Sequence, residues 1–192
     1  MQVIRKADPE FKVSLAGNFH KELEADIYDY CIPIGASYPA EVLARRAQNN
    51  LPTTYYTCCT EAFPNTFTFS DPAEAAWMSY YSAKDHLDGY LRWAYNSWPK
   101  EPLLDSRFEA WAGGDTYLVY PGARSSIRFE KLIEGVQAHE KITILRKEFT
   151  DKKNKTGFKK LEKMLSTFNL RDFPEVPAAE TVNKANKILN SL

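Results

Sequence analysis

The sequence of 192 residues lacks an excess of charge of either sign, because 25 lysines and arginines balance 25 aspartates and glutamates. A balanced chain offers no electrostatic attraction to nucleic acid or to an acidic membrane surface, so no nucleic-acid partner is expected. No apolar run approaches the length of about 18 residues that a membrane-spanning helix needs. The N-terminal stretch MQVIRKADPEF lacks the apolar segment of a signal peptide, so none is expected, and the location of this chain is not predicted.

Cysteine is scarce, and its pattern does not suggest disulfides. The three cysteines are Cys31, Cys58 and Cys59. An odd number with one adjacent pair makes a poor disulfide framework, so we expect reduced thiols that are buried at strand positions. A zinc site would need further cysteine or histidine at ligand spacing, and the three histidines lie singly along the chain. The GxGxxG and GxxxxGK(S/T) patterns are also missing, so the sequence predicts no metal, phosphate site or cofactor.

Hydrophobic residues make up 44% of the chain, which is enough for a sizeable core. Apolar or β-branched runs alternate with helical stretches over the first half of the sequence. The expected strands are 11–17, 27–33, 52–59 and 89–96, and the expected helices are 19–26, 39–48 and a third from about 70 to 86. This alternation predicts βα units and a parallel sheet, an α/β fold. The first connection, of about ten residues, is short for a parallel crossover.

The pattern changes in the second half of the chain. A long loop with the pair Gly113-Gly114 precedes a short expected strand at 116–120. An amphipathic helix is expected to start at Ser125 or Ser126 and to end near Lys147, and two further helices are expected at 158–168 and 180–192. We therefore divide the chain into a first domain, 1–150, and a helical C-terminal extension, 151–192. The charges of the extension are typical of a solvated surface.

Aromatic residues gather where the third and fourth expected strands end. The candidates for substrate binding are Tyr55, Tyr56, Trp93, Asn96 and Trp98. Ligands of parallel α/β folds bind at the carboxyl ends of strands. Tyrosine and tryptophan rings with nearby amide groups suit a sugar, whose C–H face stacks while its hydroxyls form hydrogen bonds. The alternative is that these aromatics fill the core, which on residue type alone is the commoner role.

The loop between the fourth strand and the long helix carries charged residues that can brace it. Asp105 and Arg107 are expected to form an ion pair, and Asp115 and Arg128 are further bracing candidates. Such pairs are more often structural than catalytic.

Glycoside hydrolysis usually needs two carboxylates at a suitable separation, and the sequence contains no adjacent Asp-Glu pair.

The runs DGYLRWAYNSW, GDTYLVYPG and SSIRFEKLIEG resemble the C-terminal part of the catalytic domain of glycoside hydrolase family 123. This domain overlaps a domain of unknown function in bacterial polysaccharide-degrading proteins. The resemblance covers about residues 11–148. It implies a (β/α)₈ barrel, of which residues 1–150 would form the C-terminal half with about four βα units. It also implies that full-length relatives are periplasmic or secreted.

The resemblance implies retaining β-N-acetylgalactosaminidase chemistry. In that mechanism the acetamido oxygen of the substrate attacks the anomeric carbon, an aspartate orients the amide, and a glutamate is the general acid. The Asp-Glu pair of the family lies upstream of the matched region, so the catalytic residues are not assigned in this chain. We expect part of a glycoside hydrolase for N-acetylhexosamine glycans that is inactive as an isolated chain. The alternative is a non-catalytic carbohydrate-binding or scaffold protein derived from such an enzyme.

The expected partner is a glycan or an amino sugar. Tyr56, Trp93 and Asn96 are the residues that we expect to contact it: tyrosine and asparagine would bond the acetamido group, and tryptophan would stack on the ring. Half a barrel would leave two open strand edges, and open edges invite pairing. We therefore expect either a homo-oligomer or the missing N-terminal half-barrel as a second partner.

Overall fold

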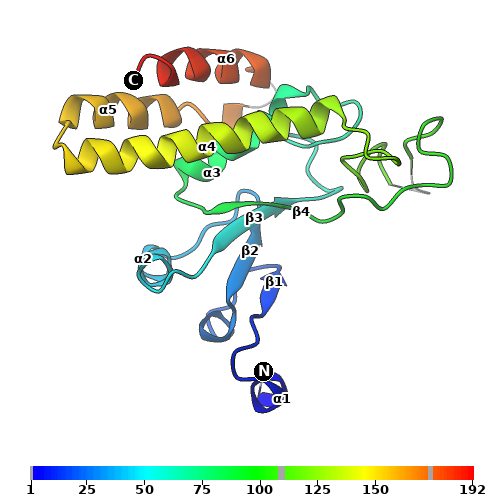
Figure 1. Ribbon diagram of the computed structural model, residues 1–192, viewed down its shortest axis with the longest axis horizontal. Coiled ribbons are helices and arrows are strands. Elements are labelled where there is room, and N and C mark those ends of the chain that lie inside the picture. The colour runs from blue at the N-terminus through cyan, green and yellow to red at the C-terminus, as the bar shows by residue number, and fades with distance from the viewer. Residues whose placement is uncertain (1, 108–110, 173–174) are drawn as a thin grey trace. The chain divides into compact units, whose positions relative to one another are not determined.

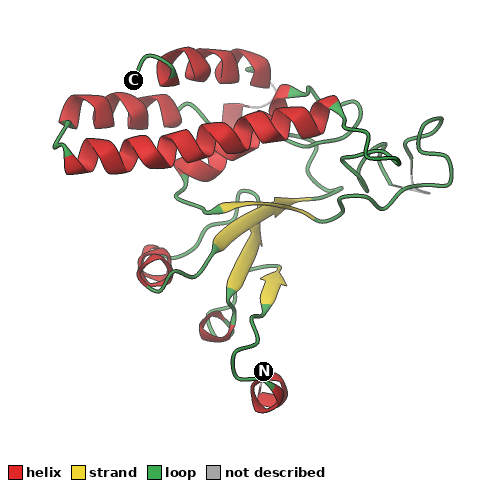
Figure 2. Ribbon diagram, in the orientation of Figure 1, coloured by secondary structure: helices red, strands yellow, loops and turns green. Residues whose placement is uncertain are grey.

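The computed structural model describes residues 2–107, 111–172 and 175–192 (Figures 1 and 2). The chain forms two compact units. The first comprises the residues up to 56 together with 87–91, and the second comprises 57–86 and 92–192. Within the described ranges, no helix is long and apolar enough to cross a membrane.

The first unit is built on a four-stranded sheet in the order β1-β2-β3-β4, which confirms the α/β prediction. Its strands are β1 (Ser14–Ala16), β2 (Asp29–Pro33), β3 (Thr53–Thr57) and β4 (Gly89–Arg92), the last of which ends in the second unit. β1 pairs in parallel with β2, and β2 pairs in parallel with β3. Tyr30, Cys31 and Ile32 of β2 are all buried, as in a parallel strand that is covered on both faces.

In the first unit, α1 (Gln2–Ala7) precedes β1, and α2 (Ala40–Gln48) connects β2 to β3 (Figure 1). The first crossover, between β1 and β2, contains only a single 3₁₀ turn, Glu24–Asp26, in place of the helix expected at 19–26. Arg46 of α2 is fully buried, and its guanidinium donates to the carbonyls of Tyr28 and Pro52, both at 2.7 Å. These bonds tie α2 to the residues that immediately precede β2 and β3.

The second unit is helical. Its helices are α3 (Ala73–Lys84), α4 (Ile127–Asp151), α5 (Lys155–Leu165) and α6 (Ala178–Leu189), with a 3₁₀ turn at Leu170–Asp172. α4, α5 and α6 all contact α3. Phe168 is fully buried and stacks on Tyr80 with 4.6 Å between ring centroids. Gly135 permits the close approach of α4 to α3, because a Cβ there would lie 2.9 Å from the Cα of Ala76.

The predicted helices of the second half are confirmed, although their bounds differ by a few residues. Ser126 is the N-cap of α4, and its hydroxyl accepts a hydrogen bond from the Phe129 amide at 3.2 Å. α4 continues to Asp151, beyond the predicted end near Lys147. The division of the chain at residue 150 stays a prediction, and α5 and α6 lie in the same compact unit as α3 and α4.

Two strand predictions were wrong. β4 ends at Arg92, so the expected strand 89–96 is too long, and 116–120 forms no strand. Instead, Asn96 and Tyr117 form an isolated antiparallel bridge, in which the Leu118 amide donates to the Tyr95 carbonyl at 2.8 Å. The aromatic, β-favouring residues of both segments therefore lie in paired loops rather than in the sheet.

The prediction that the three thiols are buried is confirmed for only one of them. Cys31 lies in β2 and is buried, and burial raises its pKa to about 11. Cys58 is half-buried and Cys59 is exposed. The reason is that β3 ends at Thr57, so the adjacent cysteines lie in the turn that follows the strand.

Candidate functional site

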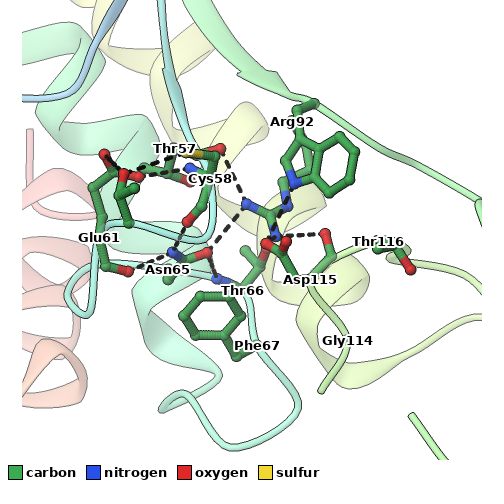
Figure 3. A network of polar contacts seen from close by, with 12 residues as sticks. Thr57, Cys58, Glu61, Asn65, Thr66, Phe67, Arg92, Gly114, Asp115 and Thr116 are labelled. Carbon is green, nitrogen blue, oxygen red and sulfur yellow. Dashed lines mark hydrogen bonds and ion pairs between the residues drawn. The ribbon is translucent and has the colours of Figure 1, made fainter. Parts of the chain in front are cut away.

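Arg92, the last residue of β4, is the centre of a polar network (Figure 3). Its Nη1 donates to the Thr57 carbonyl at 3.0 Å and to Oδ1 of Asn65 at 3.2 Å. Its Nη2 donates to the Asp115 carbonyl at 2.6 Å and forms an ion pair with the Asp115 carboxylate. The guanidinium therefore joins the end of β3 to two loops that are distant in sequence.

Asn65 organises the loop that follows β3. Its side-chain NH₂ donates to the carbonyls of Cys58 and Glu61, at 2.7 and 2.6 Å. Its Oδ1 accepts from the Thr66 amide at 2.8 Å as well as from Arg92. The side chain is fully buried, so these bonds satisfy an amide that would otherwise be costly to bury.

Glu74, in the first turn of α3, binds the backbone of the same loop. Its Oε2 accepts from the Asn65 amide at 2.7 Å, and its Oε1 accepts from the Asp71 amide at 3.1 Å. The residue is only 2% exposed, and desolvation by this burial raises the pKa of its carboxyl to about 7. A carboxyl that titrates near neutral pH therefore holds a loop of the network.

Trp93 and Trp111 form an exposed aromatic pair beside the network. Their ring centroids are 5.5 Å apart at an angle of 45°. Trp93 is 43% exposed and Trp111 is 40% exposed, although both are large apolar side chains. The indole Nε1 of Trp93 donates to Oδ1 of the fully buried Asp115 at 3.3 Å. A half-exposed indole that is held by a buried group, as Trp93 is, offers a flat apolar surface of the kind on which a sugar ring stacks.

Arg128 braces the loop that carries Asp115. Its buried guanidinium donates to the carbonyls of Gly114, at 2.8 Å, and of Thr66. Burial lowers the pKa of Arg128. Gly114 has a φ of 76°, and a Cβ there would lie 2.6 Å from Nη1 of Arg128, so the turn requires glycine. The backbone on both sides of the Arg92 network is thus fixed by a second arginine.

The five predicted substrate-binding residues occupy different environments. Trp93, Asn96 and Trp98 are exposed and lie in the second unit. The Trp98 indole donates to the Val119 carbonyl at 2.7 Å, so its N–H is already engaged. Tyr55 is 1% exposed and packs against Tyr90, with ring centroids 5.3 Å apart. This environment favours the packing role that was left open for the strand aromatics.

Tyr56 ends the first unit and is half-buried in β3. Its contact with a sugar stays a prediction that rests on its place near the carboxyl end of the strand.

The Asp105 carboxylate accepts from Nη2 and Nε of Arg107, at 2.8 and 2.9 Å. These hydrogen bonds lower the pKa of Asp105 to about 2, but both side chains are exposed. The pair is local to the loop and screened by solvent.

The sequence interpretation did not assign a role to Arg92 or to Trp111. A signal for Arg92 existed, since an arginine among the apolar and aromatic residues of a strand needs a buried counter-charge.

Within the described residues, no group of three or more histidine, cysteine, aspartate or glutamate side chains is placed to hold a metal ion. The site as described offers apolar stacking and hydrogen bonding.

Comparison with known proteins places the chain among the glycoside hydrolases. The catalytic-domain model of glycoside hydrolase 123 matches residues 1–145, and the chain therefore belongs to this family. A search of curated proteins gave no match.

Among solved structures, the chain is similar to a family 123 glycoside hydrolase from Clostridium perfringens, described in work on glycolipid glycan hydrolysis. The sequence identity is 26% and the TM-score is 0.72. The alignment covers 94% of this chain but 35% of that protein, so the chain spans about a third of its neighbour's length.

Proposed function

We propose that the chain forms the C-terminal part of a family 123 catalytic barrel and binds the N-acetylhexosamine unit of a glycan. The observation that carries the proposal is the half-exposed indole of Trp93, which directly follows β4, is held by the buried carboxylate of Asp115 and lies against the half-exposed ring of Trp111. Ligands of parallel α/β folds bind beyond the carboxyl ends of the strands. The match to the family's catalytic domain supports the choice of a sugar as the ligand.

In this proposal the chain binds and orients the sugar and does not supply the reacting carboxylates. Trp93 stacks on the apolar face of the ring, and Asn96, which is exposed three residues later, bonds the acetamido group. The sequence contains no adjacent Asp-Glu pair. The pair that orients the acetamido group and protonates the leaving oxygen in substrate-assisted hydrolysis belongs, in our proposal, to the remainder of the catalytic domain.

Titration of the ¹⁵N-labelled chain with N-acetylgalactosamine tests the binding role. We expect saturable shifts of the Trp93 indole resonance, and loss of binding in Trp93→Ala. The matched control is Phe158→Ala, which removes an aromatic ring that is 38% exposed on α5 and should leave the affinity unchanged. A chain that shows no saturable shifts, or a Trp93→Ala variant that binds as the parent does, would overturn the proposal.

Hydrolysis of an aryl β-N-acetylgalactosaminide tests the second part. We expect no chromophore release from this chain alone, and release when it is joined to upstream coding sequence that contains an Asp-Glu pair at a strand end. If no such pair is encoded upstream while the chain still binds the sugar, the chain is a non-catalytic carbohydrate-binding protein, an alternative that the missing pair favours. Release by the isolated chain would contradict our assignment of the catalytic carboxylates.

A further inference from the structure

We infer that Asp115 is a positioning residue for sugar binding, because its carboxylate fixes the orientation of the Trp93 indole. The inference rests on the proposed function, since Trp93 is the proposed stacking surface. Oδ1 of Asp115 accepts the indole N–H at 3.3 Å and is at the same time paired with Arg92. The carboxylate is therefore the link between a buried cation and an exposed ring.

An indole that is 43% exposed needs such a link. Trp93 lies beyond the end of β4, where no ladder of strand hydrogen bonds restrains the backbone. Its only packing contact with another ring is with Trp111, itself 40% exposed, among the ring contacts of the described residues. A stacking surface that has to be ordered on binding loses affinity, whereas one that is already oriented does not.

Asp115 is rigid enough to serve as the anchor. It is 0% exposed, and Arg92 holds both its carboxylate and its backbone carbonyl. The preceding residue, Gly114, is held through its carbonyl by Arg128 at 2.8 Å. A hydrogen bond to a charged acceptor is stronger than one between neutral groups, which suits a bond that must fix a ring at the protein surface.

Stability alone is a poor explanation for this carboxylate. Replacing a buried ion pair by well-packed apolar residues is often neutral or stabilising. In addition, Oδ2 of Asp115 and Nε of Arg92 are buried without a hydrogen-bond partner among the described residues. An ion pair that leaves polar atoms unsatisfied contributes little net stability. The orientation of the Trp93 indole therefore explains this carboxylate better than stability does.

A double-mutant cycle with N-acetylgalactosamine as the probe tests the inference. The variants are Asp115→Leu, Asp115→Asn and Trp93→Phe, alone and combined, with affinity measured by NMR titration and folding by thermal unfolding. We expect Asp115→Leu to weaken binding about tenfold, which corresponds to one charge-assisted hydrogen bond. In the Trp93→Phe background, which lacks the indole N–H, we expect Asp115→Leu to cause no further loss.

Asp115→Asn keeps an oxygen acceptor, so we expect it to retain most of the affinity while the Trp93 indole proton shifts upfield. This variant decides the question if Asp115→Leu does not fold. Equal losses of affinity in both backgrounds, or an unshifted indole proton in Asp115→Asn, would overturn the positioning role. A parent chain that does not bind N-acetylgalactosamine would instead overturn the proposed function, and Trp93→Phe weakening binding while every Asp115 variant binds normally would overturn this inference alone.

Discussion

Arg92 and Asp115 form a buried ion pair whose side chains are 4% and 0% exposed. Removing two charges from water costs several kcal/mol per ion, and the attraction between them roughly offsets that cost. The pair is therefore better understood by what it orients than by its net stability. Through it, the end of β4 is joined to the Thr57 carbonyl, to Asn65 and to the indole of Trp93.

Breaking this pair on one side should be far more costly than replacing it. Arg92→Met leaves the Asp115 carboxylate buried without its cation, and we expect the free energy of unfolding in urea to fall by about 3–5 kcal/mol. The double variant Arg92→Met/Asp115→Leu should recover most of that loss. Arg107→Met, which breaks an exposed ion pair that solvent screens, is the control and should change stability far less. A double variant as unstable as the single one would contradict the account.

Glu74 should make stability depend on pH. Its pKa is raised to about 7 from an ordinary value of 4.5, so the folded chain binds a proton that the unfolded chain releases. The stability linked to this proton is fully present below pH 4.5 and is lost as pH rises through about 7. The unfolding free energy of Glu74→Gln minus that of the parent should therefore increase over this range, by up to about 3 kcal/mol.

The control for this measurement is Glu10→Gln, because the Glu10 side chain is exposed. Its stability difference from the parent should stay nearly constant between pH 4.5 and 7. A Glu74→Gln difference that is equally flat would show that the buried carboxyl does not couple to folding.

The parallel sheet could be predicted because its signals are local. Each of β1, β2 and β3 lies within a predicted range, and the burial of all three central residues of β2 follows from its continuous apolar run. The end of β4 could not be predicted in this way. The residues after Arg92 have high β propensity, but the side chain of Arg92 pairs with Asp115, 23 positions along the chain, and the backbone leaves the sheet there.

The sequence predicted where the candidate site lies, at the ends of the strands, but it did not predict which side chains contact one another there. Aromatic residues at strand ends indicated Trp93 and Trp98, and both are exposed. No spacing rule joins Trp93 to Trp111 or to Asp115, because these contacts depend on how two loops pack. Tyr55 carried the same sequence signal as Trp93, yet it faces the core, since alternation along a strand does not say which face is covered.

The helices after residue 150 should not be separable from the rest of the second unit. Phe168 is fully buried and contacts the rings of Tyr80 and Trp77 on α3. Phe168→Ala should lower the unfolding free energy by about 3–5 kcal/mol, and removal of 151–192 should expose these rings and abolish cooperative unfolding. Phe158→Ala, on the exposed side of α5, is the control and should cost much less. A chain ending at 150 that unfolds cooperatively would instead support the predicted division.

The outer edge of the sheet should make the isolated chain self-associate. β1 lies at the end of the sheet order and pairs only with β2 among the described strands, so its other edge presents free backbone donors and acceptors. We expect sedimentation at micromolar concentration to show a species larger than the monomer of 22.0 kDa. Ala16→Lys places a charge at an exposed position of this edge and should shift the equilibrium toward monomer, whereas Val3→Lys, on the exposed side of α1, should not. A parent chain that is monomeric throughout would contradict the prediction.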